Sequence, residues 1–191
     1  MQDRKIIIIT APSGAGKTSI THYLLKSIPA LGFSVSAATR KPRADEKDKE
    51  DYYFISEEEF RKKIQRNEFV EWEMVYEGKY YGTLKSELAR IWKMDKIPLL
   101  DIDVKGAIHI EQQYPQNSLT IFVEPPSLNE LKNRLLSRGT ETDESLQARI
   151  NKASYELSFK HSFDRHIVND QFDRACKEAA GIVTEFINRD I

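Results

Sequence analysis

The sequence predicts an α/β fold in which a parallel sheet is flanked by helices, giving three layers. Three observations indicate it. An aliphatic, β-branched run over residues 5–10 is typical of a buried parallel strand, and a small-residue loop and a helical stretch follow it. Apolar runs of strand length recur at 97–102 and 119–123, separated by stretches of helical periodicity. A chain of 191 residues with 40% hydrophobic content is long enough for one such domain with insertions.

The core elements follow in order. A helix is predicted from about 17 to 27, with Ile20 and Leu24 on its apolar side and Pro29 and Gly32 stopping it. After an interruption, the core resumes with a helix over 84–94, a second core strand over 97–102 and a helix to about 113. A strand at 119–123 completes this half of the predicted core.

The interruption, residues 33–83, predicts a small α+β insertion between the first and second core strands. Residues 33–37 alternate in polarity, and the aromatic-rich runs at 52–55 and 69–75 predict further short strands. Ser56 and Glu59 form a capping box that opens a helix to about residue 66. The charged run at 45–51 is interpreted as an exposed loop.

The C-terminal part is predicted to be mainly helical. A capping box at 127–130 opens a helix that runs to Arg138 and ends at Gly139. A polar link at 140–143 leads into a long helix to about 159, and a short strand at 166–168 precedes a closing helix over 172–188.

Composition favours a cytoplasmic protein that binds neither nucleic acid nor membrane. The 29 basic and 30 acidic residues give a net charge of −1, so no global field attracts a polyanion. The single cysteine, Cys176, forms no intrachain disulfide, which suits a reducing compartment. No apolar stretch approaches the roughly 20 residues of a membrane span, and no signal-like segment precedes the first strand.

The loop after the first strand predicts a site for nucleotide phosphates. Small residues let backbone N–H groups close around phosphate oxygens, Lys17 can reach the β- and γ-phosphates, and the Thr18 hydroxyl can bind Mg²⁺. Ala11 stands where the strict pattern has glycine, so we expect a negative φ there. The predicted loop residues are Ala11, Pro12, Ser13, Gly14, Ala15, Gly16, Lys17 and Thr18.

A second basic cluster, Arg40 and Arg43 on either side of Pro42, suits phosphate because guanidinium groups offer a planar fork of donors. Together with the loop, it belongs to a series of segments that resembles the guanylate kinase family nearly end to end. These segments are SAATRKPR (36–43), DYYF (51–54), EW (71–72), YYGT (80–83), LDIDVKG (100–106), PPS (125–127), RGTET (138–142) and IVND (167–170).

The resemblance implies that residues 33–83 bind GMP. Arg40, Arg43, Tyr52 and Tyr81 are then expected to hold the GMP phosphate. The guanine is expected to be read by Ser36, Glu71, Thr83 and Asp103. The residue types fit, because hydroxyls can donate to guanine O6 and carboxylates can accept from its N1–H and 2-amino groups.

The resemblance also implies a lid over ATP at 125–156, with Arg134, Arg138 and Arg149 contacting the phosphates during transfer. Asp101 is expected to organise Mg²⁺ with Thr18, and Asn169 to lie near the adenine. The remaining segments, 1–32, 84–124 and 157–191, form the phosphate-loop core.

The expected reaction is therefore the Mg²⁺-dependent, in-line transfer of a phosphoryl group from ATP to GMP, and also to dGMP, in purine nucleotide metabolism. The enzyme is expected to be a monomer or a small homo-oligomer. Two alternatives stay open: a related module that binds peptides without catalysis, which ATP binding would exclude, and a kinase of similar fold acting on a phosphorylated sugar, which would not need Glu71.

Overall fold

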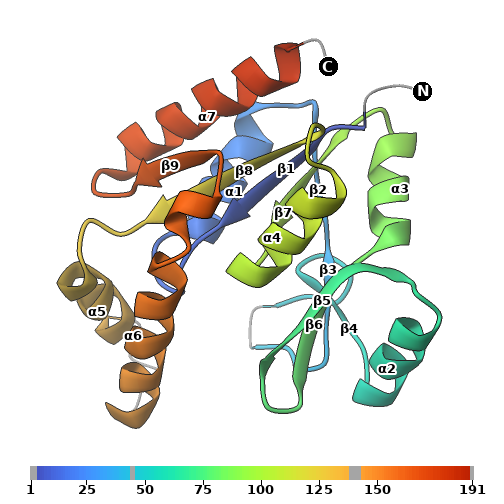
Figure 1. Ribbon diagram of the computed structural model, residues 1–191, viewed down its shortest axis with the longest axis horizontal. Coiled ribbons are helices and arrows are strands. Elements are labelled where there is room, and N and C mark those ends of the chain that lie inside the picture. Colours follow the sequence, from blue (N-terminus) through green and yellow to red (C-terminus); the bar gives the residue numbers. More distant parts are fainter. Residues whose placement is uncertain (1–3, 44–45, 138–142, 190–191) are drawn as a thin grey trace.

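The core of the protein is a parallel sheet, as predicted, and in the described residues it has five strands. The computed structural model describes residues 4–43, 46–137 and 143–189, and it orders the strands of this sheet β2-β7-β1-β8-β9 (Figure 1). All four neighbouring pairs are parallel. The strands are β1 (Ile6–Thr10), β2 (Leu31–Phe33), β7 (Ile97–Asp101), β8 (Ser118–Glu124) and β9 (Arg165–Val168).

Helices cover both faces of this sheet, which explains the aliphatic run in the first strand. Ile7 and Ile9 pack into a cluster with α1 (Lys17–Ser27) and α7 (Phe172–Asn188). Ile6 and Ile8 point to the other face, toward α3 (Lys85–Lys93) and α4 (Val104–Gln113). All four isoleucines are fully buried, because successive side chains of a strand alternate between two covered faces (Figure 1).

Of the helices in the described ranges, none has the length and apolar character that a membrane crossing requires.

A second, four-stranded sheet with the order β4-β3-β6-β5 lies beside the core, below α3 and α4 in Figure 1. Helix α2 (Glu57–Gln65) packs on it through Phe60, whose ring stacks on Phe69 at 4.3 Å. The predicted helix start is confirmed, since the Ser56 hydroxyl caps it by accepting a hydrogen bond from the Glu59 amide at 3.1 Å. The strands are β3 (Ser36–Ala38), β4 (Tyr52–Phe54), β5 (Phe69–Tyr76) and β6 (Lys79–Leu84).

The predicted position of the insertion was wrong by one strand. Phe33 pairs with Leu99 in the core sheet, whereas Ser36 pairs with Tyr52 in the second sheet, so the chain changes sheets at residues 34–35. The second sheet therefore lies between the second and third core strands. An alternating pattern is the same whichever sheet a strand joins, so it could not separate β2 from β3. No strand was predicted over 79–84, where β6 pairs with β5.

Two further helices extend from the carboxyl edge of the core. Helix α5 (Leu128–Leu136) follows its N-cap Ser127, whose hydroxyl accepts from the Glu130 amide at 3.1 Å, which confirms the predicted helix start. Leu131 and Leu135 pack against α6 (Asp143–Leu157) in a small cluster of their own. A 3₁₀ turn (Lys160–Ser162) leads from α6 to β9. The predicted helix end at Arg138 and Gly139 lies outside the described residues.

Candidate active site

A cavity of about 300 Å³ lies where the loop after β1, the end of β7, the second sheet and α6 meet. This is the carboxyl edge of the parallel sheet, where open α/β folds bind their ligands. The predicted site residues that line it are Ala11, Pro12, Ser13, Gly14, Gly16, Lys17, Thr18, Ser36, Arg43, Tyr52, Glu71, Tyr81, Asp101, Asp103 and Arg149. Predicted residues from four separate stretches of the chain (11–18, 36–81, 101–103 and Arg149) thus share one cavity.

The loop after β1 has a backbone that requires its glycines. Gly14 and Gly16 have φ values of 95° and 100°, while Ala11 is not among the residues with positive φ, as predicted. A Cβ on Gly16 would lie 2.2 Å from the Asn169 amide nitrogen, which donates to the Ala15 carbonyl at 2.8 Å. Asn169 is buried and does not line the cavity. Its hydrogen bond to the Ala15 carbonyl supports the loop.

Lys17 and Thr18 open α1 and both contact Asp101 at the end of β7. The Lys17 ammonium forms an ion pair with Asp101 and donates to the Ile102 carbonyl at 3.0 Å. Burial alone would lower the pKa of Lys17, but the Asp101 carboxylate outweighs it and the pKa is raised. The Thr18 hydroxyl donates to the second Asp101 oxygen at 3.1 Å. Lys17 therefore stays charged at the mouth of the loop.

Glu71 and Thr83 face each other across β5 and β6, and the Thr83 hydroxyl donates to the Glu71 carboxylate at 2.6 Å. Burial raises the pKa of Glu71 to about 7, since only 6% of the residue is exposed. Asp103 caps α4 by accepting from the Gly106 amide at 2.9 Å. A Cβ on Gly106 would lie 2.7 Å from a Glu71 oxygen, so this glycine lets the carboxylate approach the helix. Thr83 does not line the cavity, but its hydroxyl holds the Glu71 carboxylate, which does.

The two predicted phosphate-binding arginines are placed differently. Arg43 lines the cavity with Tyr52 and Tyr81. Arg40 lies behind these tyrosines: it donates to the Tyr81 hydroxyl at 3.0 Å and forms an ion pair with Glu46. The guanidinium of Arg40 is therefore occupied by protein groups.

The predicted lid arginines are also separated. Arg149 on α6 donates to the Ser13 hydroxyl at 3.1 Å, so α6 contacts the loop directly. Arg134 on α5 donates to Glu130 at 3.1 Å and to the Asn169 carbonyl at 2.9 Å, and it does not line the cavity. Arg138 lies outside the described residues.

Two cavity residues on α6 were not predicted. Lys152 and Glu156 lie one and two turns after Arg149, on the same face of the helix, and their charged groups are 3.6 Å apart. Only 6% of Glu156 is exposed, and burial raises its pKa. The sequence signal was the spacing of three and seven residues from Arg149, which places all three on one side of the helix.

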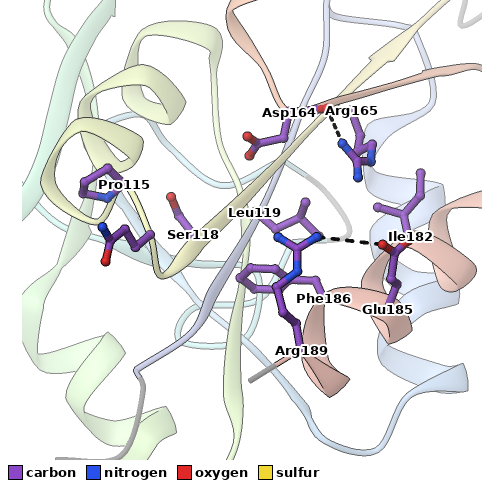
Figure 2. Close-up of a pocket in the computed structure, with 10 residues that line it drawn as sticks. Pro115, Ser118, Leu119, Asp164, Arg165, Ile182, Glu185, Phe186 and Arg189 are labelled. Atoms are coloured by element: carbon purple, nitrogen blue, oxygen red, sulfur yellow. Dashed lines mark hydrogen bonds and ion pairs between the residues drawn. The ribbon is translucent and has the colours of Figure 1, made fainter. Parts of the chain in front are cut away.

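A second cavity, of about 370 Å³, lies at the opposite, amino end of β8 and β9, beside the end of α7 (Figure 2). Its charged groups have protein partners. Asp164 accepts from the Thr120 amide and hydroxyl, both at 2.8 Å, and Arg189 lies 3.8 Å from Glu185. None of the predicted site residues lines this cavity.

Comparison with known proteins agrees with this architecture. The model of the guanylate kinase family matches residues 3–186. Curated guanylate kinases from Bacteroides thetaiotaomicron and Porphyromonas gingivalis are 45% and 46% identical, covering 97% and 96% of this chain and 91% and 98% of their own. The crystal structure of guanylate kinase from Anaplasma phagocytophilum superimposes with a TM-score of 0.80 at 28% identity, covering 97% of this chain and 87% of that one. The chain belongs to the guanylate kinase family.

Proposed function

We propose that this cavity transfers the γ-phosphoryl group of ATP to GMP, giving ADP and GDP. The observation that carries the proposal is the single cavity that joins the loop after β1 to Glu71, Arg43 and the tyrosines of the second sheet. One side has the groups expected for a nucleoside triphosphate, and the other has those expected for a guanine nucleotide. Direct transfer requires the two phosphates to meet in one space.

The acceptor side explains a preference for guanine. The buried Glu71 carboxylate can accept from guanine N1–H and the 2-amino group, and Asp103 adds a second carboxylate nearby. Adenine has a lone pair at N1 and lacks the 2-amino group, so it would leave the Glu71 carboxylate facing an acceptor. A site built on such hydrogen bonds can reject the wrong substrate by about 10⁴–10⁵-fold. The same contacts would accept dGMP, because the pairing does not involve the sugar.

The donor side has positive groups where negative charge accumulates. Lys17 and Arg149 line the cavity beside the loop, and Arg43 lines it from the acceptor side. Such charges offset the repulsion between the two substrates and stabilise the charge on the transferred group. The nucleophile is a phosphate oxygen of GMP, which is ionised at neutral pH, so the residues need not remove a proton. Arg134 and Asn169 do not line the cavity, and the predicted contacts of Arg134 with the ATP phosphates and of Asn169 with the adenine stay predictions.

Magnesium would be held by Thr18 and Asp101. Their hydroxyl and carboxylate oxygens lie 3.1 Å apart beside the loop, and hard oxygen ligands of this kind suit Mg²⁺. The described residues contain no cluster of three or more His, Cys, Asp or Glu side chains that could hold a metal alone. That agrees with a cation that takes most of its ligands from water and substrate phosphates. When bound, the ion would neutralise phosphate charge during transfer.

The test is a substrate panel. Purified protein with ATP and Mg²⁺ should form ADP rapidly when GMP or dGMP is added, and hardly at all with AMP, UMP or CMP. Failure to form ADP with GMP, or equal activity with AMP, would contradict the proposal. The Glu71→Gln variant addresses the phosphorylated-sugar alternative, since unchanged activity and substrate choice would favour it. The cytoplasmic location and the monomeric or small oligomeric state stay predictions.

A further inference from the structure

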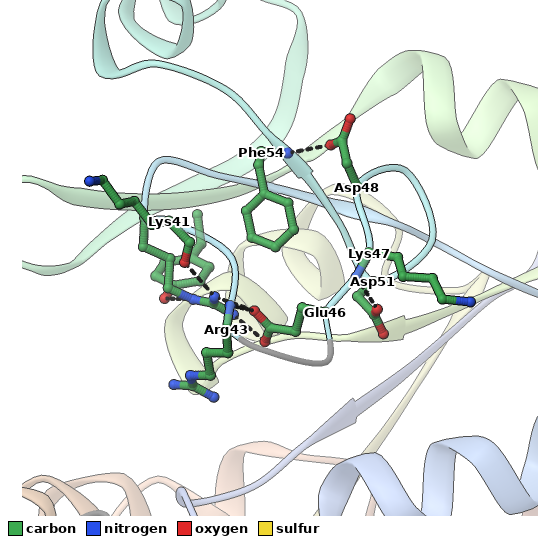
Figure 3. Close-up of polar contacts among 9 residues, drawn as sticks. Lys41, Arg43, Glu46, Lys47, Asp48, Asp51 and Phe54 are labelled. Atoms are coloured by element: carbon green, nitrogen blue, oxygen red, sulfur yellow. Dashed lines mark hydrogen bonds and ion pairs between the residues drawn. The ribbon is translucent and has the colours of Figure 1, made fainter.

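The charged run at 46–51 is more than the exposed loop that its sequence indicates. Glu46 turns inward from it, and only 18% of its side chain is exposed (Figure 3). Its two carboxylate oxygens accept from both terminal nitrogens of Arg40, at 2.5 and 2.7 Å. One of these oxygens also accepts from the Arg43 backbone amide at 2.8 Å, and the Glu46 amide donates to the Arg43 carbonyl at 3.1 Å. A single carboxylate thus holds the Arg40 guanidinium and the Arg43 backbone amide.

The rest of the loop is held by its own carboxylates. Asp48 accepts from the Phe54 amide at 3.0 Å, and Asp51 accepts from the Lys47 amide at 2.8 Å (Figure 3). The first bond attaches the loop to the end of β4, and the second closes the loop on itself just before β4 begins. These hydrogen bonds therefore hold the loop in the conformation that places Glu46 beside Arg40.

Arg40 in turn packs against the tyrosines that line the cavity. Its guanidinium lies 4.9 Å from the Tyr52 ring centre and 5.5 Å from that of Phe54, within the range of cation–π attraction. Its Nε donates to the Tyr81 hydroxyl at 3.0 Å, so the Tyr81 oxygen is an acceptor here and its own proton is available to the cavity. Bonds to Glu46, Tyr81 and the Lys41 carbonyl use four of the five N–H groups of Arg40.

We propose that Glu46 is a positioning residue of the GMP phosphate site, which acts by fixing Arg40 behind Tyr52 and Tyr81 and the Arg43 backbone at its edge. Resting on the proposed function, the inference identifies what holds the phosphate-binding groups in place before GMP arrives. The Arg40 side chain is only 11% exposed, so this ion pair is poorly screened by solvent. The hydrogen bond from Arg40 also lowers the pKa of Glu46, which keeps the carboxylate charged.

The test measures binding of GMP and of guanosine, which lacks the phosphate, by titration calorimetry. Glu46→Ala should weaken GMP binding about tenfold or more, because small displacements of positioning groups carry large costs. Guanosine binding and the KM for ATP should stay unchanged. Glu50→Ala is the matched control, since Glu50 belongs to the same loop, forms its ion pair within the described residues with exposed Lys47, and should alter none of the three. Glu46→Gln, which keeps the size and one acceptor, should give an intermediate loss and serves if the alanine variant unfolds.

A double-mutant cycle tests the route through Arg40. In an Arg40→Met background, Glu46→Ala should cause a smaller loss of GMP affinity than in the wild type, because only its contact with the Arg43 backbone amide is left to lose. Unchanged GMP binding by Glu46→Ala would overturn the inference. Tighter binding would also overturn it, because it would mean that the Glu46 carboxylate competes with the GMP phosphate for Arg40. An equal loss of guanosine binding would also overturn it. If Arg43→Met and Tyr81→Phe leave GMP binding unchanged, the proposed phosphate site itself fails; if they weaken it and Glu46→Ala does not, only this inference fails.

Discussion

Replacing Glu71 with glutamine should stabilise the unliganded protein while it weakens GMP binding. The Glu71 carboxylate is buried, and its nearest described partner is the Thr83 hydroxyl rather than a cation. Burial raises its pKa from 4.5 to about 7. The unfolded chain therefore loses this proton near pH 4.5, whereas the folded protein holds it until about pH 7. Stability from this group is greatest below pH 4.5 and is lost as the pH rises toward 7.

The magnitude follows from the two pKa values. A shift of about 2.5 units costs the folded state about 3 kcal/mol at pH 8 and about 1 kcal/mol at pH 5. Glutamine does not ionise, so the stability difference between Glu71→Gln and wild type should move by about 2 kcal/mol in favour of the variant between pH 5 and pH 8. GMP affinity should fall roughly 10- to 100-fold at pH 8, since hydrogen bonds to a charged acceptor are replaced.

The assay is urea unfolding of both proteins at pH 5 and pH 8, with GMP titrations at pH 8. Glu87→Gln provides the control of opposite sign. Burial alone would raise the pKa of Glu87, but hydrogen bonds from Arg90, the Val35 amide and Tyr53 outweigh it and lower the pKa. That variant should therefore be less stable than wild type at pH 8. A stability difference for Glu71→Gln that is the same at both pH values would refute the reasoning.

Three further predictions concern the loop after β1. Gly16→Ala should lower stability by about 2 kcal/mol or more in thermal unfolding, because φ is 100° and the new Cβ would meet Asn169. The control is Gly181→Ala in α7, which has open space around it and should be neutral or stabilising. Lys17→Met should lower kcat about 10²–10³-fold in a coupled ADP assay, and a smaller effect than tenfold would contradict its role at the phosphates. Thr18→Val should raise the Mg²⁺ concentration needed for half-maximal activity, and EDTA should abolish activity of the wild type.

Local sequence signals predicted most of the fold because the interactions behind them are local. Ser56 and Ser127 each cap a helix through an amide three residues away, so both helix starts could be predicted from four residues. The run over β1 predicted a buried strand because covered parallel strands are apolar on both faces. The division between β2 and β3 could not be predicted, since it depends on whether Phe33 pairs with Leu99 or with the second sheet.

The site residues also divide into those that the sequence predicted and those whose roles depend on tertiary contacts. The loop residues were predicted together because they are contiguous, and the resemblance supplied residues from distant segments that line the same cavity in the structure. Neither indicated that Asn169 holds the loop or that Arg40 is engaged by Glu46. These contacts join groups whose separation is set by packing between elements, and a linear pattern does not encode it.

The sequence by itself determined the phosphate loop and the alternation of strands and helices, because both depend on the spacing of nearby residues. It also determined the family, because short segments characteristic of the family occur in the same order along the chain. Only the tertiary structure decided which charged groups face the cavity and which stand behind it. Arg43 and Arg40 are three residues apart, yet one lines the cavity and the other is held by Glu46 and Tyr81. The physical reason is that a side chain's role depends on the partners that folding brings within hydrogen-bond distance, and here they come from other elements, Glu46 from the loop before β4 and Tyr81 from β6.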